Sequence, residues 1–176
     1  MDQEKNTVST PEVEVEKTMN EGEEFGLVVS NTINSGLLTG KENSMKRFTN
    51  LDLGNDEEAE LLLSAVQDCD HYLKDEIGKE IKVIAHIVNE FPRTRVDEET
   101  GEAIDYLDHS LILIDDKGES HVTGSSNAYN NYNMIISLLK RTPSKENPIN
   151  ILVGNRPDKN DPTHTYLTLK FKKEVK

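Results

Sequence analysis

Cysteine is almost absent from this sequence, and no apolar run is long enough to cross a bilayer. The single residue Cys69 cannot form an internal disulfide, which favours a reducing compartment. The N-terminus also lacks the basic-then-apolar pattern of a secretory signal. We therefore expect a soluble cytoplasmic protein without membrane contacts, located in the host cytoplasm if the protein is viral.

The motifs of the common enzyme classes are missing as well. No glycine loop has the spacing that binds phosphate, and neither Ser110 nor Ser125 lies in a nucleophile elbow. Asp115 and Asp116 are adjacent carboxylates, but Lys-Gly follows them, so we expect a hairpin turn there rather than a metal site. The histidines show no metal-ligand spacing and have no cysteine partner; they are His71, His86, His109, His121 and His164. We expect no catalytic activity, no cofactor and no metal.

Charge is distributed unevenly along the chain, which has a formal net charge of −13. Residues 1–24 contain 8 acids and 2 bases, and residues 52–77 contain 9 acids and 1 base. Residues 78–176 are nearly neutral, with 15 acids and 14 bases. The overall charge argues against a plain nucleic-acid coat protein, but a neutral C-terminal part can still carry a basic groove.

The N-terminal third is expected to contain a polar extension and one helix. Residues 1–45 are predicted to be an acidic, largely disordered extension, with a loop or weak strand over residues 25–45. A domain is expected over residues 46–176, beginning with a helix over residues 55–77 that Asn55 caps and Gly78 ends. Cys69 should be a buried structural thiol on its apolar stripe. That stripe consists of Leu62, Ala65, Val66, Cys69, Tyr72 and Leu73.

Five strand-like runs and a second helix follow. The strands are predicted over Ile81–Phe91, Tyr106–Ile114, Glu119–Gly124, Asn150–Asn155 and His164–Phe171. The helix is predicted over residues 127–140, with Asn127 as its cap. Its apolar face consists of Ala128, Tyr132, Ile135, Ile136 and Leu139. We expect residues 89–103 to form a long connection and residues 115–118 a hairpin turn.

This order of three strands, a helix and two strands is that of an OB-fold, a five-stranded Greek-key barrel. OB-folds bind oligonucleotides on strands two and three, between the loops that join strands one to two and four to five. Cationic and aromatic residues lie in or beside those two loops, as single-strand binding requires. The predicted nucleic-acid-binding residues are Phe91, Arg93, Arg95, Tyr106, Arg156, Lys159, His164, Tyr166 and Lys170.

Six segments in this order also carry a family resemblance: Phe48-Thr-Asn-Leu-Asp-Leu53, Glu60-Leu-Leu-Leu-Ser-Ala65, Ile77-Gly-Lys-Glu-Ile81, Glu98-Glu-Thr-Gly-Glu102, Leu113-Ile-Asp-Asp-Lys-Gly118 and Val122-Thr-Gly-Ser125. Within residues 46–172 the chain resembles the single-stranded DNA-binding proteins of phages of Gram-positive bacteria. The resemblance implies an OB-fold without catalytic residues that coats single-stranded DNA during phage DNA replication or recombination.

Many single-strand binders recruit partners through an acidic C-terminal tip, and this chain differs from them at both ends. Here the C-terminus is Lys172-Lys-Glu-Val-Lys176, and the acidic segment lies at the N-terminus. We expect this N-terminal tail to recruit replication or recombination proteins. The alternative function is a protein-binding OB module, such as a viral adaptor or anti-defence factor, that acts through its acidic surface and has no affinity for DNA.

Overall fold

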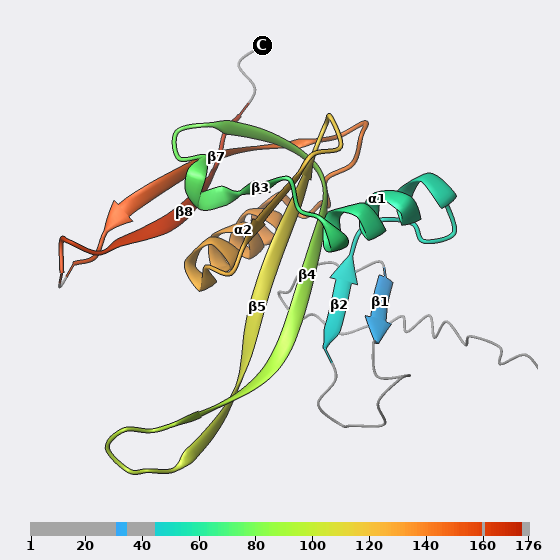
Figure 1. The fold of residues 1–176 in the computed structure, drawn as a ribbon. Coiled ribbons are helices and arrows are strands. Elements are labelled where there is room, and N and C mark those ends of the chain that lie inside the picture. The colour runs from blue at the N-terminus through green and yellow to red at the C-terminus, as the bar shows by residue number, and fades with distance from the viewer. Residues whose placement is uncertain (1–30, 35–44, 160, 174–176) are drawn as a thin grey trace, which may run out of the picture.

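The computed structural model describes residues 31–34, 45–159 and 161–173, and in this part of the chain the protein is mainly β (Figure 1). One eight-stranded mixed sheet is accompanied by two α-helices. Neither described helix is long and apolar enough to cross a membrane. The elements are β1 (Asn31–Asn34), β2 (Lys46–Thr49), α1 (Asp56–Gln67), β3 (His71–Tyr72), the 3₁₀ turn η2 (Leu73–Asp75), β4 (Glu80–Val96), β5 (Ala103–Asp115), β6 (Ser120–Thr123), α2 (Ser126–Leu139), β7 (Ile149–Pro157) and β8 (Thr165–Phe171).

The central strand is β4, which pairs with three neighbours. Its residues 80–83 pair with β7 on one edge, and its residues from Val83 to Val96 pair with β5 on the other edge, with a bulge between Val83 and Ala85. The middle of β4, residues 87–90, pairs with β2 on the edge away from β5. β5 pairs with β6, β7 with β8 and β1 with β2, all antiparallel. The predicted order of five strands and a helix is therefore confirmed.

The sheet does not close into the predicted barrel. Closure would require β6 to pair with β8, and the described strands contain no such pair. The free edge of β6 is occupied instead by β3, which pairs with it in parallel through His71 and His121. Because a strand has only two edges, β3 excludes β8 from this position.

Helix α2 covers the main core. Ala128, Tyr132 and Ile136 are fully buried against β4, β5, β7 and β8. The helix begins one residue earlier than predicted, and its cap is Ser125, whose Oγ accepts a hydrogen bond from the Ala128 amide. The prediction of Asn127 as the cap was wrong. Lys140 ends the helix in the left-handed conformation, with φ at 50°.

Helix α1 covers a second core, formed with Ile87, Ile112 and other residues on the opposite face of the sheet. Its Asn55 cap is confirmed, since the side chain accepts a hydrogen bond from the Glu57 amide. The helix ends at Gln67, however, so the predicted extent to residue 77 and the role of Gly78 were wrong. The helix stops because Asp70 accepts hydrogen bonds from the amide and hydroxyl of Ser120, which starts the pairing of β3 with β6.

Cys69 follows α1 and does not lie on its stripe. It is partly buried, and its thiol donates to the carbonyl oxygens of His71 and Ser120 at 3.5 and 3.4 Å. Both contacts lie within the backbone framework of β3 and β6, as a structural role requires.

The long connection predicted over residues 89–103 is instead the outer part of a β-hairpin. β4 continues to Val96 and β5 starts at Ala103, so that a paired arm extends well beyond the core (Figure 1). Gly101, with φ at 71°, lies in the turn. The turn predicted at residues 115–118 is confirmed, with Gly118 at φ 85°. Of the predicted N-terminal extension over residues 1–45, the structure describes only β1 and Met45; the rest of that prediction lies outside the described residues.

Candidate nucleic-acid interface

The β4–β5 arm carries four of the predicted binding residues on one face. Side chains alternate between the faces of a strand, so Phe91, Arg93 and Arg95 of β4 point the same way. Tyr106 of β5 is the register partner of Arg93 and therefore lies on that face too. Both arginines are exposed, and Tyr106 is 44% exposed. We call this set, with its polar base at Asn89, the arm face.

Each arginine on the arm face lies near an aromatic ring. The guanidinium carbon of Arg93 is 5.9 Å from the centroid of Phe91, and that of Arg95 is 5.8 Å from the centroid of Tyr106. Such contacts contribute about 0.5–1 kcal/mol at exposed sites. They hold positive charge beside flat apolar rings, which is the combination that contacts phosphates and bases together.

One further cation, which the sequence pattern did not indicate, lies at the base of this face. Arg47 on β2 is the register partner of Asn89, and its Nε donates to the Asn89 side-chain oxygen at 2.7 Å. Asn89 in turn donates to the Ser110 hydroxyl at 3.1 Å. Partial burial lowers the pKa of Arg47, but a guanidinium still stays charged at neutral pH. Arg47 could not be predicted because β2 was not predicted: four residues are too few to show a recognisable alternation of apolar and polar side chains.

The other five predicted residues lie on the β7–β8 hairpin. Arg156 is the register partner of Tyr166, whose hydroxyl donates to Asp158 and thereby has its pKa raised. His164, in the loop, contacts Asp161 at 2.6 Å between Nδ1 and Oδ2. Hydrogen bonds from Thr163 and His164 lower the pKa of Asp161. Lys159 and Lys170 are exposed.

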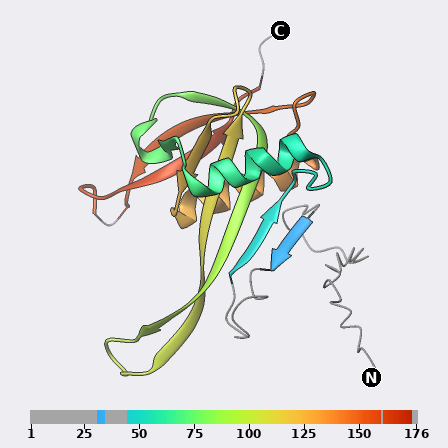
Figure 2. The same ribbon diagram turned by 45° about the vertical axis from the view of Figure 1, so that its right-hand side comes forward.

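The structure thus divides the nine predicted residues between two hairpins. In both ribbon views the tips of the β4–β5 and β7–β8 hairpins project toward the same side of the molecule (Figures 1 and 2). Phe91, Arg93, Arg95 and Tyr106 are brought together on the first hairpin, and Arg156 and Tyr166 on the second.

Negative charge is concentrated at the tip of the β4–β5 arm. Asp97, Glu98, Glu99 and Glu102 surround the turn, and the amides of Thr100 and Glu99 lower the pKa of Asp97 by hydrogen bonding. These carboxylates repel phosphate. On this arm, a polyanion therefore meets favourable charge along the inner part of the arm face, between Arg47 and Arg95.

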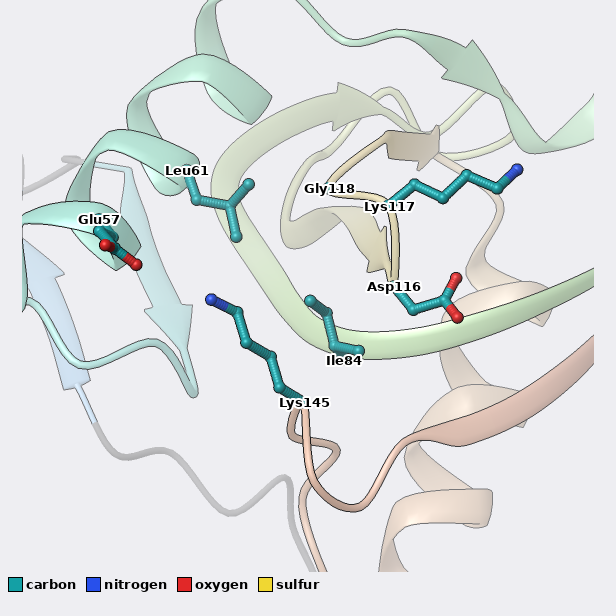
Figure 3. Close-up of a pocket in the computed structure, with 7 residues that line it drawn as sticks. All are labelled: Glu57, Leu61, Ile84, Asp116, Lys117, Gly118 and Lys145. Atoms are coloured by element: carbon teal, nitrogen blue, oxygen red, sulfur yellow. The ribbon is translucent and has the colours of Figure 1, made fainter.

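A shallow pocket of about 410 Å³ lies between α1 and the β5–β6 turn (Figure 3). Lys145 reaches into it toward Glu57, whereas the side chains of Asp116 and Lys117 point away. Two carboxylates and two ammonium groups balance one another in its lining. This pocket therefore offers no net charge to an ionic ligand.

One cluster among the described residues has the composition of a metal site. Asp115, Glu119 and His121 place one ligand atom each within 4.8 Å of the others. The turn predicted at Asp115 is present, since Asp115 Oδ1 accepts hydrogen bonds from the amides of Lys117 and Glu119. The sequence signal for the cluster is the Asp-x₃-Glu-x-His spacing, because antiparallel pairing across the hairpin brings these three residues together.

Comparison with known proteins finds no matching family model, no similar curated protein and no similar solved structure.

Proposed function

We propose that this protein binds single-stranded DNA without catalysis, as part of phage DNA replication or recombination. The order β4-β5-β6-α2-β7-β8 is that of an OB-fold, a Greek-key barrel that is often partly open. In this assignment the β4–β5 and β7–β8 hairpins are the loops that flank the oligonucleotide in OB-folds. The resemblance of residues 46–172 to phage single-strand binders supports the same function.

The observation that carries the proposal is the arm face. Arg93 and Arg95 provide cations for phosphates, and the rings of Phe91 and Tyr106 provide stacking surfaces for bases. Arg156 and Tyr166 repeat this pairing on the second hairpin. Every base can stack on an aromatic ring, so we expect binding with little sequence preference. The proposal places the protein in the cytoplasm of the host cell, with partners recruited through the acidic N-terminal residues.

The test is a fluorescence anisotropy titration with labelled oligothymidine and with a duplex of the same length, at low and moderate salt. We expect the wild type to prefer the single strand. Phe91→Ala and Tyr106→Ala should each weaken binding by about 1–3 kcal/mol, which is roughly 5- to 150-fold. Leu107→Ala is the matched control, because Leu107 is also exposed on this arm but points to the opposite face.

Two results would contradict the proposal. Equal affinity for the duplex and the single strand would exclude stacking as the mode of binding. Unchanged affinity in both ring variants, with Leu107→Ala also unchanged, would place any DNA contact away from the arm face.

The second candidate function is a protein-binding module without DNA affinity. The carboxylates at the arm tip favour it, because the exposed Glu98, Glu99 and Glu102 form, with the half-buried Asp97, an acidic surface that suits a basic partner. In the same titration this function predicts no anisotropy change with either oligonucleotide, even at the lowest salt.

A further inference from the structure

A carboxylate–histidine cluster lies at the end of the β5–β6 hairpin, where β3 and η2 pack beside it. Asp115 is the last residue of β5, Glu119 lies in the turn, and His121 belongs to β6. Glu76 follows η2, and His71 of β3 is the parallel register partner of His121. Two stretches of the chain, residues 71–76 and 115–121, thus bring their side chains to one place.

His121 is the central residue of this cluster. It is 4% exposed, and its Nδ1 lies 2.6 Å from Oε2 of Glu76, which is also buried. Its Nε2 is buried and has no hydrogen-bond partner. This Nε2 forms an ion-pair contact with Oδ2 of Asp115, and the two atoms are 3.6 Å apart. This distance is longer than a hydrogen bond and close to the separation of two atoms that bind the same ion.

The contact with Glu76 determines what His121 can do. A carboxylate on Nδ1 favours the tautomer that carries its proton there, which leaves the lone pair on Nε2. Histidine ligands of metals are oriented in this way, with a carboxylate on the nitrogen that does not bind the ion. Nε2 then points toward Asp115, whose Oδ1 is used by the turn amides. Oδ2 of Asp115 is therefore the oxygen oriented toward a common centre.

Two further donors border this centre from the solvent side. Oε2 of Glu119 lies 3.5 Å from Nε2 of His71, and the rings of His71 and His121 are stacked at 5.1 Å. The side chains of His71 and Glu119 are 40% and 45% exposed, so an ion can reach the cluster from water. The ligand atoms of Asp115, Glu119 and His121 lie within 4.8 Å of one another, whereas His71 lies outside this group, beside Glu119. Carboxylate and imidazole donors suit zinc, which accepts four ligands in tetrahedral geometry.

We propose that this chain binds one Zn²⁺ ion through His121, Asp115 and Glu119, with Glu76 orienting His121 and the His71 side chain moving in to become the fourth ligand. The site ties β3 to the β5–β6 hairpin across the edge that β8 would close in a barrel. Because zinc would bind the folded chain and not the unfolded chain, it would stabilise the folded state by mass action.

The test uses the full-length chain without an affinity tag, since added histidines would bind zinc themselves. Isothermal titration with ZnCl₂ should give one strong site per chain, together with a higher melting temperature. Glu119→Gln and His71→Gln are the first variants, because both side chains are partly exposed and their loss should leave the fold intact. Each should weaken zinc binding by at least about tenfold, since each removes a ligand.

Asp116→Asn is the matched control. Asp116 is the neighbour of Asp115 in sequence, but its carboxylate pairs with Lys82 at 3.2 Å and lies outside the cluster. The Asp116→Asn variant should bind zinc as tightly as the wild type does. Equal weakening in Asp116→Asn and Glu119→Gln would mean that surface carboxylates bind zinc nonspecifically, and the proposal would be wrong.

Two measurements address the core of the site directly. X-ray absorption of the zinc-loaded protein should show nitrogen and oxygen ligands at about 2.0–2.1 Å with imidazole scattering. Glu76→Gln, once circular dichroism shows it to be folded, should keep one site but weaken it by about 10–100-fold. The competing interpretation is that Glu76 and Asp115 hold His121 in place without an ion. It predicts no zinc site in the wild type, and that result would overturn the proposal.

Discussion

The Nδ1 atom of His86 lies 3.0 Å from the hydroxyl oxygen of Tyr132, and both side chains are fully buried beneath α2. Burial lowers the pKa of His86 from 6.5 to about 4, because an imidazolium there would lose its hydration. Burial also raises the pKa of Tyr132, so both groups are neutral at pH 7. The backbone of His86 is fixed as well: its amide donates to Asn50 and its carbonyl accepts from Thr49.

This burial predicts a loss of stability in mild acid. The unfolded chain protonates His86 near pH 6.5 and the folded chain only near pH 4, so the unfolded state binds more protons between these values. The free energy of unfolding should therefore fall as the pH drops from 6.5, with a loss from His86 approaching roughly 3 kcal/mol at pH 4. Urea unfolding across this range measures it.

The variant His86→Gln should show a flatter pH profile than the wild type, because it lacks this titration. His164→Gln is the control, since His164 lies in an exposed loop of the β7–β8 hairpin. It should keep the wild-type profile. Parallel profiles for the wild type and His86→Gln would show that other groups cause the acid sensitivity.

The second core predicts a large difference between two adjacent leucines of α1. Leu62 is 4% exposed and packs with Ile84, Ile87 and Ile112, whereas Leu63 is 55% exposed. Leu62→Ala should reduce the free energy of unfolding by about 2–5 kcal/mol. Leu63→Ala should change it by about 0.5 kcal/mol or less, as is usual for surface substitutions. Thermal or urea unfolding compares them, and equal effects would mean that α1 does not cover the sheet in solution.

The apolar periodicity of the sequence was enough to predict the core elements. Ala128, Tyr132 and Ile136 repeat at helical spacing and are the residues that α2 buries. The alternation of Leu167 and Leu169 likewise marked β8, and both residues pack on the main core. Burial selects apolar side chains at these positions, so the pattern and the structure share one cause.

Features held by polar contacts could not be predicted in this way. The outer part of the β4–β5 arm has no core to cover, so Arg93, Thr94 and Arg95 give no alternation of apolar and polar residues. The end of α1 depends on Asp70 binding Ser120, a contact between residues far apart in sequence. Three ligands of the zinc-site candidate lie on the β5–β6 hairpin, whereas the position of His71 depends on the pairing of β3 with β6. The nine predicted binding residues lie on two hairpins. Arg47 could not be added to them from the sequence, because its position beside Asn89 depends on the pairing of β2 with β4.

The arm face also predicts a change in salt dependence. If Arg93 and Arg95 neutralise phosphates, the double variant Arg93→Gln with Arg95→Gln should lower the slope of log affinity against log salt by about two, one for each lost contact. Lys82→Gln is the control, because Lys82 lies at the other end of β4 and pairs with Asp116. Anisotropy titrations over a salt series provide the slopes. A slope equal to that of the wild type would place the phosphate contacts elsewhere.

The final prediction concerns residues 1–24, which carry 8 acids against 2 bases. Their deletion removes a net negative charge from a chain that is proposed to bind a polyanion. If these residues compete with DNA for the cations of the arm face, the shortened protein should bind oligothymidine more tightly. The gain should be largest at low salt and should shrink as salt screens the charges. If they serve only solubility or partner recruitment, the two binding curves should coincide at the lowest salt, where a competing segment has its greatest effect.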